Sequence, residues 1–297
     1  MKLGIPRALF YYLNGDIVIN CFKKLGIDIV VSPKTTKKII ADGLYYAPDE
    51  MCLSMKNYLG HVAYLKDKCD YILVPRIDNY YTFNQTCTNF LAARDIAENI
   101  FDVDVLDYNI DLNNKDTLKK GVFKIARSLG YKVSEISVAY LYAVNICEKR
   151  HKKLVSKNIE KLNSEKKKVL LISHGYNTYD ELIGIPIINK LKMENIEVIY
   201  SDLLDSSMCR KLSKNISKEL YWKYSREAIG AYEMVKNRID GVVFLSTFPC
   251  GVDSLVNQLL ILKLELPYLN IVIDDNDADN GIDTRIESFF DIINCYK

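Results

Sequence analysis

The sequence lacks the short motifs that mark the common cofactor sites. No C-x-x-C pair is present, so there is no local signature of a zinc, thioredoxin or ferredoxin site. The phosphate-binding patterns G-x-x-x-x-G-K-S/T and G-x-G-x-x-G are also absent, and the chain therefore shows no nucleotide-binding fingerprint. Any metal site must be assembled from segments that lie far apart in the sequence.

Long apolar runs and a strong net charge are lacking as well. No apolar stretch approaches the ~20 residues that a transmembrane helix needs, and Pro6 and Arg7 interrupt the start in a way that a signal peptide does not show. A formal net charge of +2 provides no global basic field for nucleic acid. We therefore expect a cytoplasmic protein that binds neither membrane nor nucleic acid. In that compartment its eight cysteines are not expected to form disulfides.

Strand and helix signals alternate along the chain, which predicts an α/β fold with parallel sheets. Apolar, β-branched runs of strand length occur at 3–5, 27–31, 69–77, 101–106, 168–173, 196–200, 241–245 and 268–273. Helical periodicity occurs at 16–25, 118–129, 134–161, 185–192 and 284–293. The pattern predicts two Rossmann-like lobes, 1–148 and 167–297, joined by a basic linker helix over 149–166, with a cleft between the lobes.

Three cysteines share one local setting. Cys52, Cys87 and Cys250 each follow a loop and open a segment with helical character. The free N–H groups and partial positive charge of a helix start favour the thiolate, which is the form that binds metal. The three side chains are thus candidate ligands of one anionic iron–sulfur cluster. Because cysteine is among the most buried residue types, three core thiols are the alternative, and the spacing leaves both open.

The other cysteines lack this setting, and the three histidines differ in their surroundings. Four of the five remaining cysteines fit core positions and Cys209 is uninformative; the four are Cys21, Cys69, Cys147 and Cys295. His174 ends a predicted strand, which places it at the edge where sites form in α/β sheets. His61 either reaches a site near Cys52 or is a hydrogen-bonded surface residue, and His151 lies on the basic helix, where we expect it to be solvated.

Several segments together resemble a known family. They are Gly4-Ile5-Pro6-Arg7-Ala8-Leu9, Glu50-Met51-Cys52-Leu53 with Lys56 and Gly60-His61, Val74-Pro75-Arg76, Phe248-Pro249-Cys250-Gly251-Val252-Asp253-Ser254-Leu255 and Gly281-Ile282-Asp283-Thr284-Arg285-Ile286-Glu287. In this order they resemble the activase-related relatives of 2-hydroxyacyl-CoA dehydratase and benzoyl-CoA reductase subunits, a group that includes double-cubane cluster proteins. The chain departs from the family's pattern after the first and second cysteines, with Ser54 and with Thr88-Asn89.

The resemblance implies a cofactor, a partner and a reaction class. It implies a [4Fe-4S] or double-cubane cluster held between the lobes by Cys52, Cys87 and Cys250, and a separate ATP-dependent activator protein as partner. The implied function is low-potential electron transfer, or reductive chemistry on an acyl-CoA or small molecule, in an anaerobic setting and as a homo- or heterodimer. No catalytic residue is identified. The alternative is a metal-free ligand-binding or scaffold protein that keeps the fold.

Overall fold

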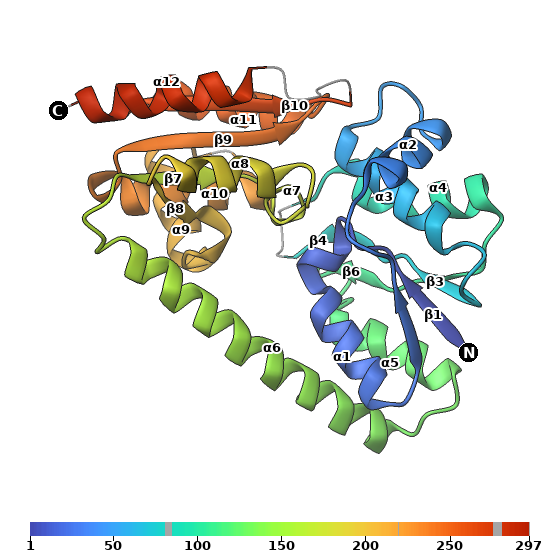
Figure 1. Ribbon diagram of the computed structural model, residues 1–297. Helices are drawn as coiled ribbons and strands as arrows, with labels where there is room; N and C mark the ends of the chain where they lie inside the picture. Colours follow the sequence, from blue (N-terminus) through green and yellow to red (C-terminus); the bar gives the residue numbers. More distant parts are fainter. Residues whose placement is uncertain (81–84, 219, 276–280, 297) are drawn as a thin grey trace. The chain divides into compact units, whose positions relative to one another are not determined.

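The computed structural model describes residues 1–80, 85–218, 220–275 and 281–296 (Figure 1). The chain divides into two compact units, Met1–His151 (unit 1) and Lys152–Lys297 (unit 2). Helix α6 (Val133–Lys161) runs through the boundary between them. Over the described ranges, no helix combines the length and the apolar character needed to cross a membrane.

Unit 1 contains a four-stranded parallel sheet in the order β2-β1-β3-β5. Its strands are β1 (Lys2–Ile5), β2 (Asp28–Val31), β3 (Tyr71–Leu73) and β5 (Val105–Leu106). A parallel pair, β4 (Arg76–Asn79) with β6 (Asn109–Asp111), continues β3 and β5 along the chain. The strand expected over 69–77 is split in two because Pro75, between β3 and β4, has no N–H to donate.

Helices surround this sheet, and two of them approach each other unusually closely. The unit 1 helices before α6 are α1 (Asp16–Lys24), α2 (Lys37–Tyr46), α3 (Leu53–Leu65), α4 (Thr88–Phe101) and α5 (Leu118–Ser128). A Cβ on Gly60 of α3 would lie 1.9 Å from the carbonyl oxygen of Ile39 in α2. A Cβ on Gly43 of α2 would lie 2.0 Å from the carbonyl oxygen of Lys56. Only glycine permits this backbone contact.

The α2–α3 contact predicts a large effect of a single methyl group. Gly60→Ala should lower the free energy of unfolding by about 3 kcal/mol, because the helices must separate to admit the Cβ. Lys37→Ala, on the exposed side of α2, is the matched control and should change stability by less than about 0.5 kcal/mol. Urea denaturation followed by circular dichroism measures both. Equal midpoints for Gly60→Ala and the wild type would refute the packing argument.

Unit 2 contains a second four-stranded parallel sheet, in the order β10-β9-β7-β8. Its strands are β7 (Lys168–Ile172), β8 (Glu197–Tyr200), β9 (Gly241–Thr247) and β10 (Tyr268–Ile273). Strand β9 is buried along its whole length, which explains its unbroken apolar run. From β7 the chain goes first to β8 on one side and later to β9 on the other. The strand order thus reverses between β7 and β9, where α/β sheets place their ligands.

Helices cover both faces of the second sheet. They are α7 (Gly175–Thr178), α8 (Gly184–Met193), α9 (Ser206–Leu212), α10 (Lys223–Val235), α11 (Gly251–Ile261) and α12 (Ile282–Cys295). Ile229 and Leu260, from α10 and α11, share one core cluster with Phe244 of the sheet. Phe289 of α12 lies over Gly241 on the opposite face. The predicted fold class, α/β with parallel sheets, is confirmed in both units.

One predicted strand is much shorter than expected. The expected strand at 101–106 is reduced to Val105–Leu106, because Phe101 is the last residue of α4. Asp102 ends that helix in the left-handed conformation with φ 47°. The apolar residues around Phe101 therefore belong to the end of a helix and to a short strand that follows it.

Candidate functional site

The three cysteines singled out by the sequence all occupy helix starts, as predicted. Cys52, Cys87 and Cys250 are the N-cap residues of α3, α4 and α11, and none of them makes a side-chain capping hydrogen bond. The side-chain amide of Asn89 in α4 donates to the Cys52 Sγ at 3.7 Å, so the starts of α3 and α4 adjoin. Cys250 belongs to unit 2, and the joint ligation of a cluster by all three stays a prediction.

The arrangement of possible metal ligands and the burial of the remaining cysteines bear on metal binding in the described part of the chain. Among the residues that the structure describes, no group of three or more His, Cys, Asp or Glu side chains is placed to hold a metal ion. Burial raises the pKa of Cys21 to about 11 and that of Cys209 to about 12. Burial also raises the pKa of Cys69 and of Cys147. These four thiols are therefore protonated at neutral pH, and Cys295 is exposed.

His61 is fully buried in unit 1 and links the loop after β2 to helix α3. Its Nδ1 lies 2.8 Å from the Ser32 Oγ and its Nε2 lies 3.1 Å from the Thr35 Oγ1. Both hydroxyls belong to the loop after β2, whereas His61 is in α3. Burial, with a smaller contribution from Arg7, lowers the pKa of His61 to about 3. The ring is therefore neutral and holds the loop to the helix; it is hydrogen-bonded, as one of the two alternatives held, but it is buried and does not lie at the surface.

In unit 2 the side chain of His174 meets that of Asp253. His174 follows β7 and Asp253 is in the first turn of α11, which follows β9. The His174 Nε2 lies 3.1 Å from the Asp253 Oδ1. Free N–H groups at the helix start stabilise the Asp253 carboxylate, whose side chain is 8% exposed. The pair thus bridges the two strands between which the strand order reverses.

Two tyrosine rings enclose the imidazole of His174. The Tyr176 ring stacks on it at 4.7 Å with an interplanar angle of 11°, and the Tyr224 ring stacks at 3.6 Å and 26°. Burial raises the pKa of Tyr224 well above its usual value, and the charges of Asp253 and Asp202 raise it further. Ser201 lies close enough to Tyr224 to oppose this rise, although neither hydroxyl has a partner of good hydrogen-bond geometry. The sandwich fixes the plane of the imidazole.

Asp202 adds a second carboxyl group after the neighbouring strand β8. The Tyr179 hydroxyl donates to its Oδ1 at 3.2 Å. A Cβ on Gly175 would lie 3.3 Å from its Oδ2, so the carboxyl group adjoins the backbone next to His174. Surrounding protein atoms raise the pKa of Asp202 to about 6, even though the residue keeps an exposed surface. A carboxyl group with this pKa exchanges its proton near neutral pH.

One titratable side chain therefore follows each of three adjacent strands, so the three side chains lie at the same edge of the sheet. They are His174 after β7, Asp202 after β8 and Asp253 after β9. When the Asp253 carboxylate accepts a hydrogen bond from the Nε2–H of His174, the Nδ1 of the neutral ring is left as an acceptor. The sheet edge then offers the Nδ1 of His174 as a base and the Asp202 carboxyl group as a partly protonated acid. His174 was predicted from the sequence, whereas Asp253, Tyr224 and Asp202 were not singled out as site residues.

The fold and this edge define a parallel α/β protein with a candidate ligand site at a strand-order reversal. A family model described as "CoA enzyme activase uncharacterised domain (DUF2229)" matches residues 2–204. The chain belongs to this family, whose name points to an enzyme as partner. No curated protein matches the chain in sequence.

Solved structures show only distant likeness. The SBP FpvC from P. aeruginosa in complex with Ni²⁺ is 14% identical, with 99% of this chain and 94% of that chain covered and a TM-score of 0.31. The periplasmic zinc binding protein TroA from Treponema pallidum is 9% identical, with 98% of each chain covered and a TM-score of 0.29. At these TM-scores the likeness carries no conclusion about this chain.

The family match corrects the resemblance drawn from the sequence. The chain belongs to a CoA enzyme activase family, on the activating side, and the identification as a relative of dehydratase or benzoyl-CoA reductase subunits is wrong. The implied function, an iron–sulfur protein of dehydratase-like low-potential chemistry, is wrong with it. The segments behind the resemblance include the end of β1 and the starts of α3 and α11. Such segments fix loop geometry, which many reactions can share.

Proposed function

We propose that the protein takes part in activating a CoA-dependent enzyme and that its working site is the carboxyl edge of the unit 2 sheet. The family match supports the activating role. The observation that carries the site is the His174–Asp253 pair, which joins the loops after β7 and β9 at 3.1 Å. In this proposal the edge binds a small ligand and exchanges a proton with it.

The free energy spent on burying these polar side chains favours a role of the sheet edge in ligand chemistry over a purely structural role. Enclosing an imidazole between two tyrosine rings and burying a carboxylate beside it cost desolvation free energy, and a packed apolar pair would hold the same loops at less cost. Groups that titrate near neutral pH gather where a site performs proton transfer. Asp202, with a pKa of about 6, meets this description, and it lies at the same sheet edge as the oriented ring of His174.

The experiment is an activation assay with the full chain. A CoA-dependent enzyme is purified from the same cells in its low-activity state and mixed with ATP, a reductant and increasing amounts of this protein. We expect the activity of the enzyme to rise with the amount of protein added and to saturate as a complex forms. Heat-denatured protein is the control. If no CoA-dependent enzyme of these cells gains activity, the proposed role is wrong.

A further inference from the structure

Helix α6 carries a row of exposed apolar side chains within unit 1. Leu141 is 67% exposed and Val138 is 62% exposed, and Tyr142 and Ile146 lie exposed beside them. Ile136, Ala139 and Ala143 of the same helix are buried, and Ala139 adjoins the exposed face. Exposed apolar side chains that recur on one face of a helix are typical of an interaction surface.

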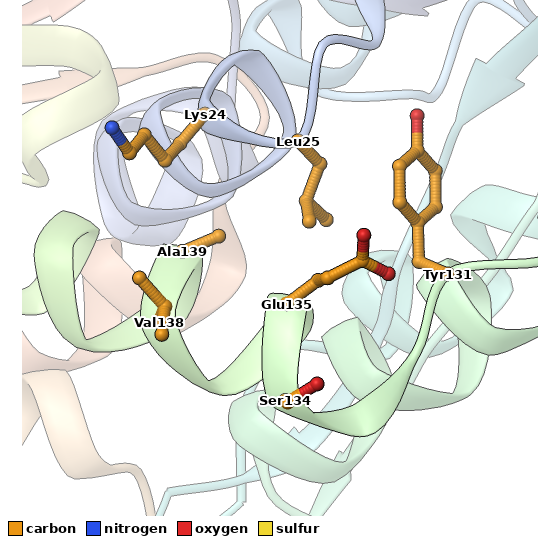
Figure 2. A pocket seen from close by; sticks show the side chains of 7 residues that line it. All are labelled: Lys24, Leu25, Tyr131, Ser134, Glu135, Val138 and Ala139. Atoms are coloured by element: carbon orange, nitrogen blue, oxygen red, sulfur yellow. The ribbon is translucent and has the colours of Figure 1, made fainter.

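A groove adjoins this face (Figure 2). It has a volume of about 410 Å³ and lies between the end of α1 and the start of α6, lined by Lys24, Leu25, Tyr131, Ser134, Glu135, Val138 and Ala139. Val138 belongs both to the groove and to the exposed face, so the two are continuous. The ammonium group of Lys24 lies 5.0 Å from the centre of the Tyr142 ring and holds that ring at the middle of the face.

Five residues in a stripe beside Leu141 form a palindrome in spacing and in charge. Glu135, Val138, Tyr142, Ile146 and Lys149 follow one another at intervals of 3, 4, 4 and 3, which is the spacing of one helix face (the α6 face). The apolar positions 138 and 146 are equally far from Tyr142. The acidic and the basic end of the face lie seven positions, or about 10 Å, on either side of it.

Such a face is complementary to its own copy in the antiparallel direction. A two-fold axis at Tyr142 sets Glu135 of one copy against Lys149 of the other, and Val138 against Ile146. The groove beside Val138 gives room for that Ile146. Arg150, next along the helix, is held by Asp16 of its own chain at 2.9 Å, which leaves Lys149 as the cation nearest to Ile146 on the face, with Lys153 one turn further on. Like charges would meet if the two helices ran parallel, with Glu135 beside Glu135.

We propose that the α6 face pairs antiparallel with the α6 face of a second copy of this chain. The interface is isologous, since each copy contributes the same patch. The pairing is independent of the proposed role in enzyme activation. The strength of this self-association depends on the two Glu135–Lys149 contacts between the copies.

Sedimentation of the full chain at micromolar concentration and low ionic strength tests the pairing. The wild type should be a dimer. Lys149→Glu should raise the dissociation constant on the order of 10-fold, because two carboxylates then face each other twice. Glu135→Lys should do the same. The double variant Glu135→Lys/Lys149→Glu should return to within about 3-fold of the wild type, since the ion pairs are rebuilt in reverse.

Controls separate the pairing from damage to the helix. Glu135 also accepts a hydrogen bond from the Lys132 N–H at 2.8 Å, so circular dichroism must show that each variant keeps its helix content. Lys37→Glu, at an exposed position of α2 in unit 1, reverses a charge outside the α6 face and should leave the dissociation constant unchanged. A monomeric wild type, or a double variant as weak as the single variants, would overturn the proposal.

Discussion

Replacing His61 by alanine is expected to lower the free energy of unfolding of unit 1 by about 4 kcal/mol. The change removes the ring that meets the hydroxyls of Ser32 and Thr35 at 2.8 and 3.1 Å. Each buried hydroxyl that loses its partner costs about 1–3 kcal/mol, and the cavity left by the ring adds to this cost. Urea denaturation, with hydrogen exchange of the α3 amides as a local probe, measures the loss.

His151→Ala is the matched control for this prediction. His151 is exposed on α6, and its removal should change stability by less than about 0.5 kcal/mol. Equal unfolding midpoints for His61→Ala and His151→Ala would show that the loop after β2 does not depend on His61.

The same histidine predicts a loss of stability in acid. The pKa of His61 falls from 6.5 to about 3 on folding, so below about pH 6.5 the unfolded chain binds a proton that the folded chain does not. Stability therefore decreases as the pH falls from 6.5 towards 3, by up to about 1.4 kcal/mol per pH unit from this group. The His61→Ala variant should lack this part of the pH dependence. If the free energy of unfolding changed with pH to the same extent in the wild type and in the variant, the argument from the burial of His61 would be contradicted.

Replacing His174 by glutamine is expected to reduce the activation of the partner enzyme by roughly 100-fold. Removal of a group that transfers protons typically costs this much or more. Glutamine keeps a donor near the Asp253 carboxylate, so the sheet edge should retain its fold. His151→Gln is the control with the same chemical change at an exposed site and should activate like the wild type. Unchanged activation by the folded His174→Gln variant would remove His174 from the site.

The strands of both sheets follow from the sequence for a simple reason. In parallel sheets covered on both sides, a strand needs apolar residues on both faces, as in the fully buried β9. The resulting β-branched runs also predicted β1, β2 and β7 close to their observed bounds. The helix starts at Cys52, Cys87 and Cys250 were equally visible, because each follows a loop and opens an apolar segment.

Two of the helices that were not predicted, α2 and α10, each contain a glycine that acts in packing. Gly43 of α2 contacts the backbone of α3, and a Cβ on Gly230 of α10 would lie 1.7 Å from the carbonyl oxygen of Cys209 in α9. In a sequence, glycine indicates a turn or a weak helix, whereas here it permits close approach of two backbones. Since α10 was missed, Tyr224, which stacks on His174, was missed as well.

The side chains that meet His174 could not be predicted from local sequence patterns. Asp253 lies 79 positions further along the chain and reaches His174 only because β9 pairs with β7. Asp202 reaches the same edge because β8 pairs with β7 on the other side. The sequence could show that His174 ends a strand, but the register of three strands decides which side chains meet it.

The most direct test of the central claim, that the carboxyl edge of the unit 2 sheet is the working site, is a double-mutant cycle in the activation assay. His174→Gln, Asp253→Asn and the double variant are compared with the wild type at equal concentrations, after circular dichroism has shown that each is folded. If the two side chains act as one proton-handling pair, the double variant should be no weaker than the weaker of the two single variants. Losses that multiply in the double variant, or full activation by all three variants, would contradict the claim.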